Sequence, residues 1–127
     1  MAHPLCGRTI VVTRPRAQAS RLAAWIGEQG GEALVFPLLE ISAAADPAPL
    51  QAAIDRLDTY ALAIFISPNA VDCSLPAILA RRPWPTALRP AAIGPGTVTA
   101  LAAYGIGDVL LPTDRFDSEA LLAVPGL

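Results

Sequence analysis

The sequence of 127 residues contains no lysine, because all nine of its lysine-plus-arginine positions are arginines. A lysine amine is needed for a Schiff-base intermediate and for the phosphate-binding loop of P-loop proteins, so both kinds of site are excluded. The single histidine, His3, stands beside the N-terminus. One histidine cannot build a histidine-rich metal site, and the scarcity of these residue types therefore excludes several common catalytic and metal-binding designs.

Cysteine is scarce as well, since only Cys6 and Cys73 are present. They are far apart and fit no Cys-x-x-Cys or zinc-ligand spacing, so we expect two unpaired thiols, buried or half-buried. The N-terminus lacks the basic segment and apolar run of a signal peptide. Residues 90–107, the longest stretch without charge, are interrupted by proline and glycine and cannot form a spanning helix of about 20 apolar residues. We therefore expect a cytoplasmic protein with no membrane partner.

Charge is the third feature of which the chain has little. Only 16% of the residues are charged, the formal net charge is -2, and 54% of the residues are hydrophobic. A nucleic-acid-binding protein needs a basic patch or stripe, which is absent, so no nucleic-acid partner is expected. The apolar content is sufficient to bury a substantial core, and the length corresponds to about one domain.

Short apolar runs alternate with segments of helical spacing along the whole chain. We predict strands at 9–13, 61–67, 91–93 and 109–111, and helices at 17–28, 47–57, 69–80, 98–104 and 118–123. This alternation predicts an α/β protein with parallel, doubly wound (flavodoxin-like) sheets. The continuous apolar run at 61–67 further predicts a strand buried on both faces. Residues 33–42 contain Pro37, which favours an edge strand or a connector.

In open α/β sheets, ligands bind at the carboxyl ends of the strands, where the next helices begin. A helix N-terminus presents free N–H groups and a partial positive charge, and it therefore favours anions. Four such turns each carry a small hydroxyl or amide side chain, and the first also carries an arginine: 13–15, 67–70, 94–97 and 113–119. The residues alone thus predict an α/β domain that binds an anionic ligand.

Each of these turns also has a purely structural interpretation. The residues Ser67, Asn69, Thr97 and Ser118 are of the types preferred as helix N-caps. Arg14 is equally well explained as a solvated surface arginine, and Gly94 and Gly96 as turn residues. A non-catalytic α/β module that binds an anion or another ligand therefore stays open. A dinucleotide-binding domain is disfavoured, because residues 13–15 (TRP) stand where a Gly-x-Gly-x-x-Gly loop should follow the first strand.

Five segments, taken in their order and spacing, resemble the N-terminal half of uroporphyrinogen-III synthases. They are 10–15 (IVVTRP) with Gln18, 36–41 (FPLLEI), 65–71 (FISPNAV), 92–97 (AIGPGT) and 114–122 (DRFDSEALL). The resemblance implies two similar α/β domains joined by a two-strand connector. On that pattern, residues 1–31 begin the first domain, 32–42 form an outgoing connector strand, and 43–127 form part of the second domain. The chain would then supply roughly half of the synthase fold.

The resemblance also implies a reaction, that of a lyase in tetrapyrrole and heme biosynthesis. Hydroxymethylbilane, a linear tetrapyrrole with eight carboxylates, loses water and is cyclised with inversion of its last pyrrole ring to uroporphyrinogen III. No metal or cofactor is implied. We expect this chain to be inactive alone, because the tyrosine that the family is thought to use would follow Leu127. Tyr60 and Tyr104 do not match that position and are assigned to packing.

The resemblance implies four substrate-binding residues and no catalytic residue in this chain. Ser67 and Thr97 match positions that line the family's cleft, and Arg14 and Asn69 are added as neighbours of the same kind. An incomplete parallel sheet leaves an unpaired edge and exposed apolar surface, so we also expect self-association through a sheet edge.

Overall fold

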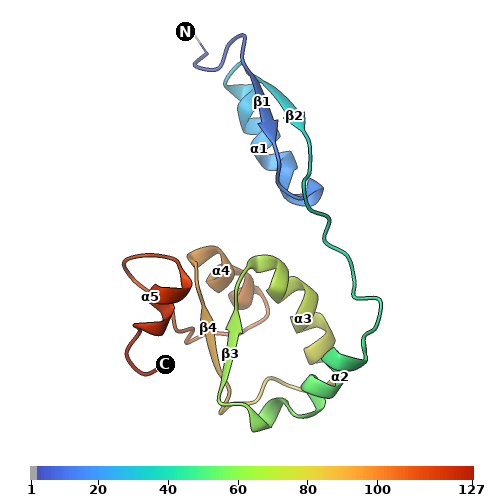
Figure 1. Cartoon of the computed structure of the whole chain (residues 1–127), viewed down its shortest axis with the longest axis vertical. Coiled ribbons are helices and arrows are strands. Elements are labelled where there is room, and N and C mark those ends of the chain that lie inside the picture. The colour runs from blue at the N-terminus through green and yellow to red at the C-terminus, as the bar shows by residue number, and fades with distance from the viewer. Residues whose placement is uncertain (1–2) are drawn as a thin grey trace. The chain divides into compact units, whose positions relative to one another are not determined.

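The computed structural model describes residues 3–127 and divides the chain into two compact units, Met1–Ala43 and Ala44–Leu127. Each unit contains two parallel strands, with the single helix α1 packed beside them in unit 1 and several helices in unit 2 (Figure 1). This mixed α/β architecture with parallel strands confirms the predicted fold class. Within residues 3–127, no helix is both long and apolar enough to cross a membrane.

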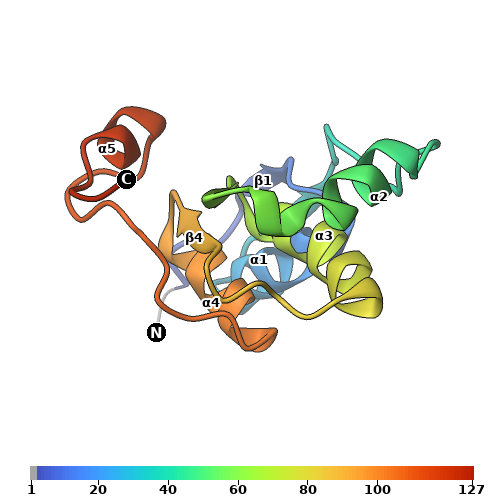
Figure 2. The same ribbon diagram turned by 90° about the horizontal axis from the view of Figure 1, so that it is seen from below.

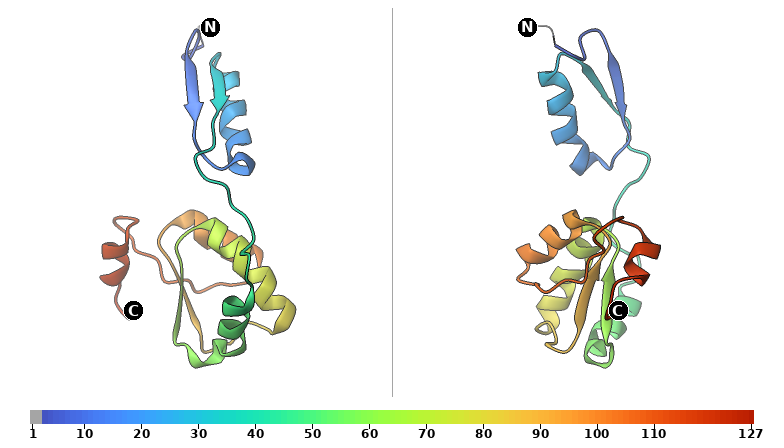
Figure 3. Two further views of the ribbon diagram at one scale, coloured as in Figure 1. Left: turned by 45° about the vertical axis from the view of Figure 1, so that its right-hand side comes forward. Right: turned by 90° about the vertical axis from the view of Figure 1, so that its left-hand side faces the viewer.

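Unit 1 is a single strand–helix–strand element. It consists of β1 (Thr9–Val12), α1 (Arg16–Glu28) and β2 (Glu32–Val35), and the two strands pair in parallel with Val11 beside Leu34. Helix α1 lies along one face of the strand pair (Figure 3). The helix ends where predicted, because the chain reverses at Gly30, whose φ of +81° strongly favours glycine.

The core of unit 1 is small. Its buried residues are Val12, Ala19 and Ile26, with Leu5, Ile10, Ala33 and Val35 packed around them. After β2 the chain continues beside β1 for a few residues, since the N–H groups of Phe36 and Leu38 donate to Val12 and Thr13. Residues 39–47 then form no helix or strand, and the division between the units falls after Ala43.

Unit 2 contains the second strand pair and most of the helices. Strands β3 (Leu62–Phe65) and β4 (Arg89–Ala92) pair in parallel, and Leu110 adds one further parallel bridge to Ala91. The predicted strand at 109–111 is therefore reduced to a single bridge. The other elements are α2 (Ala48–Asp55), the 3-10 turn η1 (Leu57–Thr59), α3 (Pro68–Arg81), α4 (Pro95–Ala103) and α5 (Ser118–Leu122). Helix α5 lies apart from α3 and α4, after an extended segment (Figure 2).

The core of unit 2 lies on one face of its sheet. Phe65 of β3 packs there with residues of α2, α3 and α4, among them Ile54, Leu75 and Leu101. The opposite face of β3 is open, since Ile64 is 50% exposed and Ile66, which follows the strand, is 71% exposed. The prediction that 61–67 is buried on both faces is therefore wrong for the described residues, because helices α2–α4 all cover the same side.

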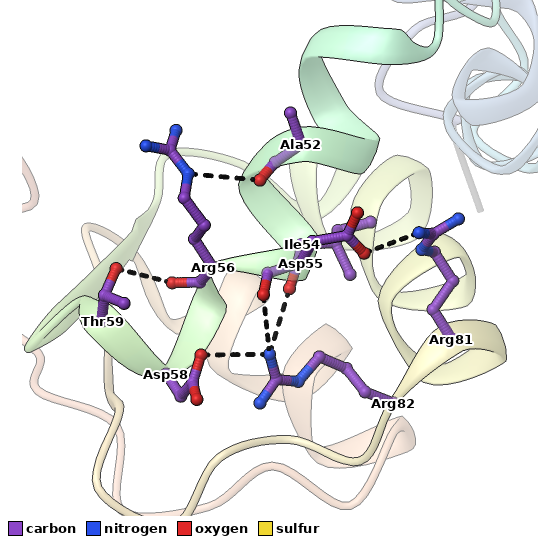
Figure 4. Close-up of polar contacts among 8 residues, drawn as sticks. All are labelled: Ala52, Ile54, Asp55, Arg56, Asp58, Thr59, Arg81 and Arg82. Carbon is purple, nitrogen blue, oxygen red and sulfur yellow. Dashed lines mark hydrogen bonds and ion pairs between the residues drawn. The ribbon is translucent and has the colours of Figure 1, made fainter.

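A group of polar contacts fastens α2 and η1 to the C-terminal end of α3 (Figure 4). Arg81 pairs with Asp55 at 2.6 Å, and Arg82 pairs with Asp58 at 3.2 Å. Arg82 also donates to the backbone carbonyls of Ile54 and Asp55. These arginines are therefore engaged in holding the fold together, at the end of α3 that is remote from the strand-to-helix turn.

Candidate functional site

The carboxyl ends of β3 and β4 lie at the same edge of the unit 2 sheet, because the two strands are parallel. Helix α3 begins directly after β3, and α4 begins directly after β4. Their first turns are neighbours, since a Cβ atom added at Gly96 would lie 3.8 Å from Cγ of Pro68. Two helix N-termini therefore converge at this edge, which is an arrangement that favours an anionic ligand.

Ser67 is the N-cap of α3. Its hydroxyl oxygen accepts a hydrogen bond of 3.1 Å from the N–H of Ala70, so the capping interpretation of Ser67 is confirmed. A hydroxyl that accepts a bond still carries its own proton, and the partly buried Ser67 retains one donor for a further acceptor. Asn69 is the second residue of α3 and partly buried, so its predicted capping role is wrong.

The N-terminus of α4 has no side-chain cap, because its N-cap residue is Gly94. The N–H groups of Thr97 and Val98 both donate to the Gly94 carbonyl, at 3.2 and 3.4 Å. Pro95 has no N–H, and in residues 3–127 no backbone carbonyl accepts the N–H of Gly96. The first turn of α4 therefore offers one open backbone donor beside the first turn of α3.

Thr97 is the third residue of α4 and is only 3% exposed. It is not the N-cap, so that interpretation is wrong for Thr97 too. Among the described residues, every buried side-chain nitrogen or oxygen has a hydrogen-bond partner. Thr97 is therefore buried in the first turn of α4, whereas Ser67 and Asn69, at the start of α3, are partly exposed.

Arg14 belongs to the other unit. It follows the carboxyl end of β1 and precedes α1, and it is exposed. The structure therefore brings Ser67, Asn69 and Thr97 together in unit 2 and places Arg14 at the equivalent strand-to-helix turn of unit 1.

The fourth turn is closed by an aspartate that sequence reasoning missed. Asp117, not Ser118, is the N-cap of α5, and its carboxylate accepts a 2.8 Å bond from the N–H of Ala120. It also pairs with Arg115 at 3.3 Å. Aspartate is among the best N-cap residues, and its place just before 118–122 was the available signal. Because a carboxylate already occupies this helix end, it is less suited to a second anion.

The two tyrosines and the cysteines do not add an acid–base group to this edge. Tyr104 donates a 3.2 Å hydrogen bond to Asp72 and packs against the unit 2 core, as predicted. Loss of hydration raises the pKa of the Tyr104 phenol, and the charge of Asp72 adds to the rise. Tyr60 is exposed rather than packed. Cys6 and Cys73 are unpaired as expected, but both are exposed, so the prediction of burial is wrong.

Other features of unit 2 lie away from the converging helix ends. A hollow of about 670 Å³ opens at the amino end of β4, between Trp84, Arg89 and Asp108. It lies beside the C-terminal end of α4, where the helix dipole disfavours anions. In the described part of the chain, no three His, Cys, Asp or Glu side chains are placed to hold a metal ion.

Comparison with known proteins gives one consistent family. Residues 20–125 match the family model described as uroporphyrinogen-III synthase HemD. A uroporphyrinogen-III synthase of Salmonella typhimurium is 36% identical over 121 residues, which is 94% of this chain and 49% of that protein. A uroporphyrinogen-III synthase of Synechococcus elongatus is 32% identical over 124 residues, covering 94% of this chain and 46% of that protein. The chain spans about half the length of these curated relatives.

Proposed function

The chain belongs to the uroporphyrinogen-III synthase family, and on that premise we propose that it supplies one half of such an enzyme. The complete enzyme cyclises hydroxymethylbilane to uroporphyrinogen III, with inversion of the last pyrrole ring and loss of water. In this proposal the present chain binds and positions the substrate. The group that assists departure of the hydroxyl comes from the other half, and the chain alone is inactive.

The observation that carries this proposal is the pair of helix N-termini at the carboxyl edge of β3 and β4. Hydroxymethylbilane has eight carboxylates, and a carboxylate is stabilised by backbone N–H groups and hydroxyl donors at a helix start. The open N–H of Gly96 and the hydroxyl of Ser67 are donors of this kind. We propose Asn69 and Thr97, in the first turns of the same two helices, as further substrate-binding residues of unit 2. Arg14, at the equivalent turn of unit 1, is proposed as a separate substrate-binding residue.

Gly96 supports a binding role, because the fold itself does not require a glycine at this position. Gly94 has φ −129° and ψ 161°, which any residue adopts, and a Cβ added there would meet nothing within 4 Å. At Gly96 an added Cβ would make only an ordinary contact with Pro68. Gly94 is nevertheless the N-cap, where glycine is favoured over alanine. Inside a helix alanine is about 1 kcal/mol better than glycine, so Gly96 is not explained by the stability of α4. Glycine at position 96 instead leaves the backbone open to the close approach of a ligand.

We propose that these residues act by holding the substrate in one conformation. The substrate is long and flexible, and simple ring closure competes with closure after inversion of the last ring. Groups that fix several carboxylates restrict the substrate to the conformation in which inversion occurs, and positioning of this kind accounts for large rate effects. No metal or cofactor enters the proposal. Exposed free thiols at Cys6 and Cys73 fit a reducing compartment, and a cytoplasmic location is part of the proposal.

The test is the isomer of uroporphyrin formed from hydroxymethylbilane. Three proteins are compared: the 127-residue chain, the remaining half of the Salmonella typhimurium relative, and a chimera in which this chain replaces the matching half. We expect the type III isomer from the chimera alone, and the type I isomer of spontaneous closure from each half. Type III product from this chain by itself would contradict the half-enzyme proposal.

Failure of the chimera needs one further measurement to be informative. If the folded chimera gives only type I product, the synthase proposal is wrong for this chain. Saturable binding of hydroxymethylbilane by that chimera would then favour the non-catalytic anion-binding module.

A further inference from the structure

Helices α3 and α4 are connected by a side-chain hydrogen bond as well as by apolar packing. The hydroxyl of Tyr104, the residue at which α4 ends, donates to the carboxylate of Asp72 in α3 at 3.2 Å. Both helices also contribute fully buried leucines, Leu75 and Leu101, to the unit 2 core. A hydrogen bond at the surface adds little to the stability of such a core. We therefore looked for its effect in the placement of α4 beside α3.

On α3, Asp72 shares a face with the start of the candidate site. It lies four residues after Pro68, and residues with this spacing lie one above the other along a helix. Pro68 is the residue of α3 that lies beside Gly96, since a Cβ added at Gly96 would come within 3.8 Å of Cγ of Pro68. One face of α3 therefore carries both the contact with the first turn of α4 and the acceptor of the Tyr104 bond.

On α4, Tyr104 shares a face with Thr97. Thr97, Leu101 and Tyr104 have the i, i+4, i+7 spacing of one helix face. The first two are buried, and Tyr104 packs against the unit 2 core. This face extends from the first turn of α4, which carries the open N–H of Gly96, to the Tyr104 bond. A short helix moves as a rigid element, so a displacement at Tyr104 also displaces the first turn.

The two ends of α4 are held differently. After Tyr104 the chain turns at Gly105, whose φ is +78°, and the N–H groups of Gly105 and Ile106 donate to carbonyls of α4 at 3.0 and 3.1 Å. Ile106 is buried in the unit 2 core. The other end has no side-chain cap, because its N-cap is Gly94. The helix is thus anchored at its C-terminal end, and the position of its first turn follows from that anchor.

We propose that Tyr104 is a positioning residue of the substrate site, because its bond to Asp72 sets the distance between the first turns of α3 and α4. That distance separates the two donors proposed for carboxylates, the hydroxyl of Ser67 and the N–H of Gly96. Two donors hold one substrate conformation only when their spacing matches that of the groups they bind. Tyr104 itself touches no substrate. The inference rests on the proposed function and adds to it the residue that aligns the two helices.

The test uses the chimera in which this chain replaces the matching half of the Salmonella typhimurium relative. Tyr104→Phe removes the hydroxyl and keeps the ring, and Asp72→Ala removes the acceptor. Each should raise the KM for hydroxymethylbilane about 2- to 10-fold, the range that loss of one hydrogen bond allows. Because KM does not depend on how much of the enzyme is folded, a purely structural role of the bond would leave KM unchanged.

Three further variants serve as controls. Asp72→Asn should keep KM close to that of the unsubstituted chimera, because the amide oxygen can still accept from Tyr104. Tyr104→Phe combined with Asp72→Ala should raise KM no further than either change alone, since both remove the same bond. Tyr60→Phe is the matched control, because Tyr60 is an exposed tyrosine of unit 2 that lies outside α3 and α4. It should leave KM unchanged.

The outcomes separate this inference from the proposed function. An active chimera whose KM is unchanged in both Tyr104→Phe and Asp72→Ala, or is raised as much by Tyr60→Phe, overturns the positioning role and leaves the proposed function intact. A chimera that forms no type III isomer before any of these substitutions overturns the proposed function, and this inference with it.

A second measurement needs no activity. In an NMR spectrum of the 127-residue chain, Tyr104→Phe should shift the amide resonances of Gly96 and Thr97, at the opposite end of α4. Tyr60→Phe should leave both resonances in place. Changes confined to the neighbours of Tyr104 would show that the first turn of α4 does not follow this bond, and would overturn the positioning role.

Discussion

The two units share the same arrangement of strands and helices but differ in the size of the hydrophobic core that each one buries. In each, a helix connects two parallel strands and covers one sheet face, while apolar residues of the other face stay exposed. Unit 1 buries three core residues under one helix, whereas unit 2 buries ten residues under α2, α3 and α4. The comparison indicates that unit 2, which carries the candidate site, has much the larger core of its own within this chain.

The largest expected effect follows from breaking the core of unit 2. Leu75 of α3 is fully buried in that core, and Leu75→Ala should lower the free energy of unfolding by about 2–5 kcal/mol. Leu79→Ala, in the exposed part of the same helix, is the control and should change it by less than about 0.5 kcal/mol. Urea unfolding followed by circular dichroism measures both. Equal effects would show that unit 2 has no cooperative core.

The same comparison can be sharpened within unit 1. Ile26→Ala removes one of only three buried core residues, so amide protection in β1, α1 and β2 should be lost. Protection in β3 and β4 should persist, because unit 2 has its own core. Hydrogen exchange of this one variant measures amide protection in both units in the same experiment. Simultaneous loss of protection in the two units would contradict their independence.

A smaller but more informative effect is expected at Gly96. Gly96→Ala should stabilise α4 by about 1 kcal/mol. In the chimera described above, however, it should lower the yield of the type III isomer, because the methyl group lies between the first turns of α3 and α4, 3.8 Å from Cγ of Pro68. Gly27→Ala in α1 is the control, since a Cβ there meets nothing within 4 Å and Gly27 lies away from the converging helix ends. Gly27→Ala should stabilise α1 by a similar amount and should leave the yield of the type III isomer unchanged. Equal yields of the type III isomer from both variants would contradict a binding role for Gly96.

Sequence reasoning was most successful where a local pattern determines local structure. The alternation of apolar runs and helical spacing located β1, α1, β3, α3 and α4 to within a few residues. It failed for Ile64 and Ile66, because an apolar run does not reveal whether a second layer of helices exists to cover it. The edge of converging helices was predictable from parallel topology alone. The burial of Thr97 was not, since it depends on how α4 packs beside α3.

The N-caps show the same limit at the scale of single residues. Residue type alone offered Ser67, Asn69, Thr97 and Ser118, but only Ser67 is a cap. A cap is defined by the residue at which helical dihedral angles begin, and helix boundaries are the least certain part of any prediction from sequence.

Ser67→Ala tests the distinction between a cap and a first helical residue. It removes the acceptor for the N–H of Ala70 and should cost about 1 kcal/mol of stability, as loss of an N-cap does. Ser118→Ala is the matched control, because the cap of α5 is Asp117. Thermal unfolding of both variants checks the difference, and a cost at Ser118 as large as that at Ser67 would contradict the assigned caps.

The smallest expected effect concerns the pH dependence of unit 2. A hydrogen bond from Arg82 lowers the pKa of the Asp58 carboxyl, with a further contribution from the charge of Arg82. Because the pKa is lower in the folded state, the resulting stabilisation is present above the ordinary aspartate pKa of about 3.9 and is lost as the pH falls through the folded value. Both side chains are partly solvated, so the contribution to stability is small. Arg82→Gln should therefore raise the pKa of Asp58 toward its ordinary value in an NMR titration. Arg56→Gln is the control, because Arg56 donates to the carbonyl of Ala52 and makes no ion pair with Asp58. It should leave the pKa of Asp58 unchanged. An unchanged Asp58 pKa in Arg82→Gln would show that this contact does not persist in solution, which leaves the Arg81–Asp55 pair and the buried apolar residues to hold α2 against α3.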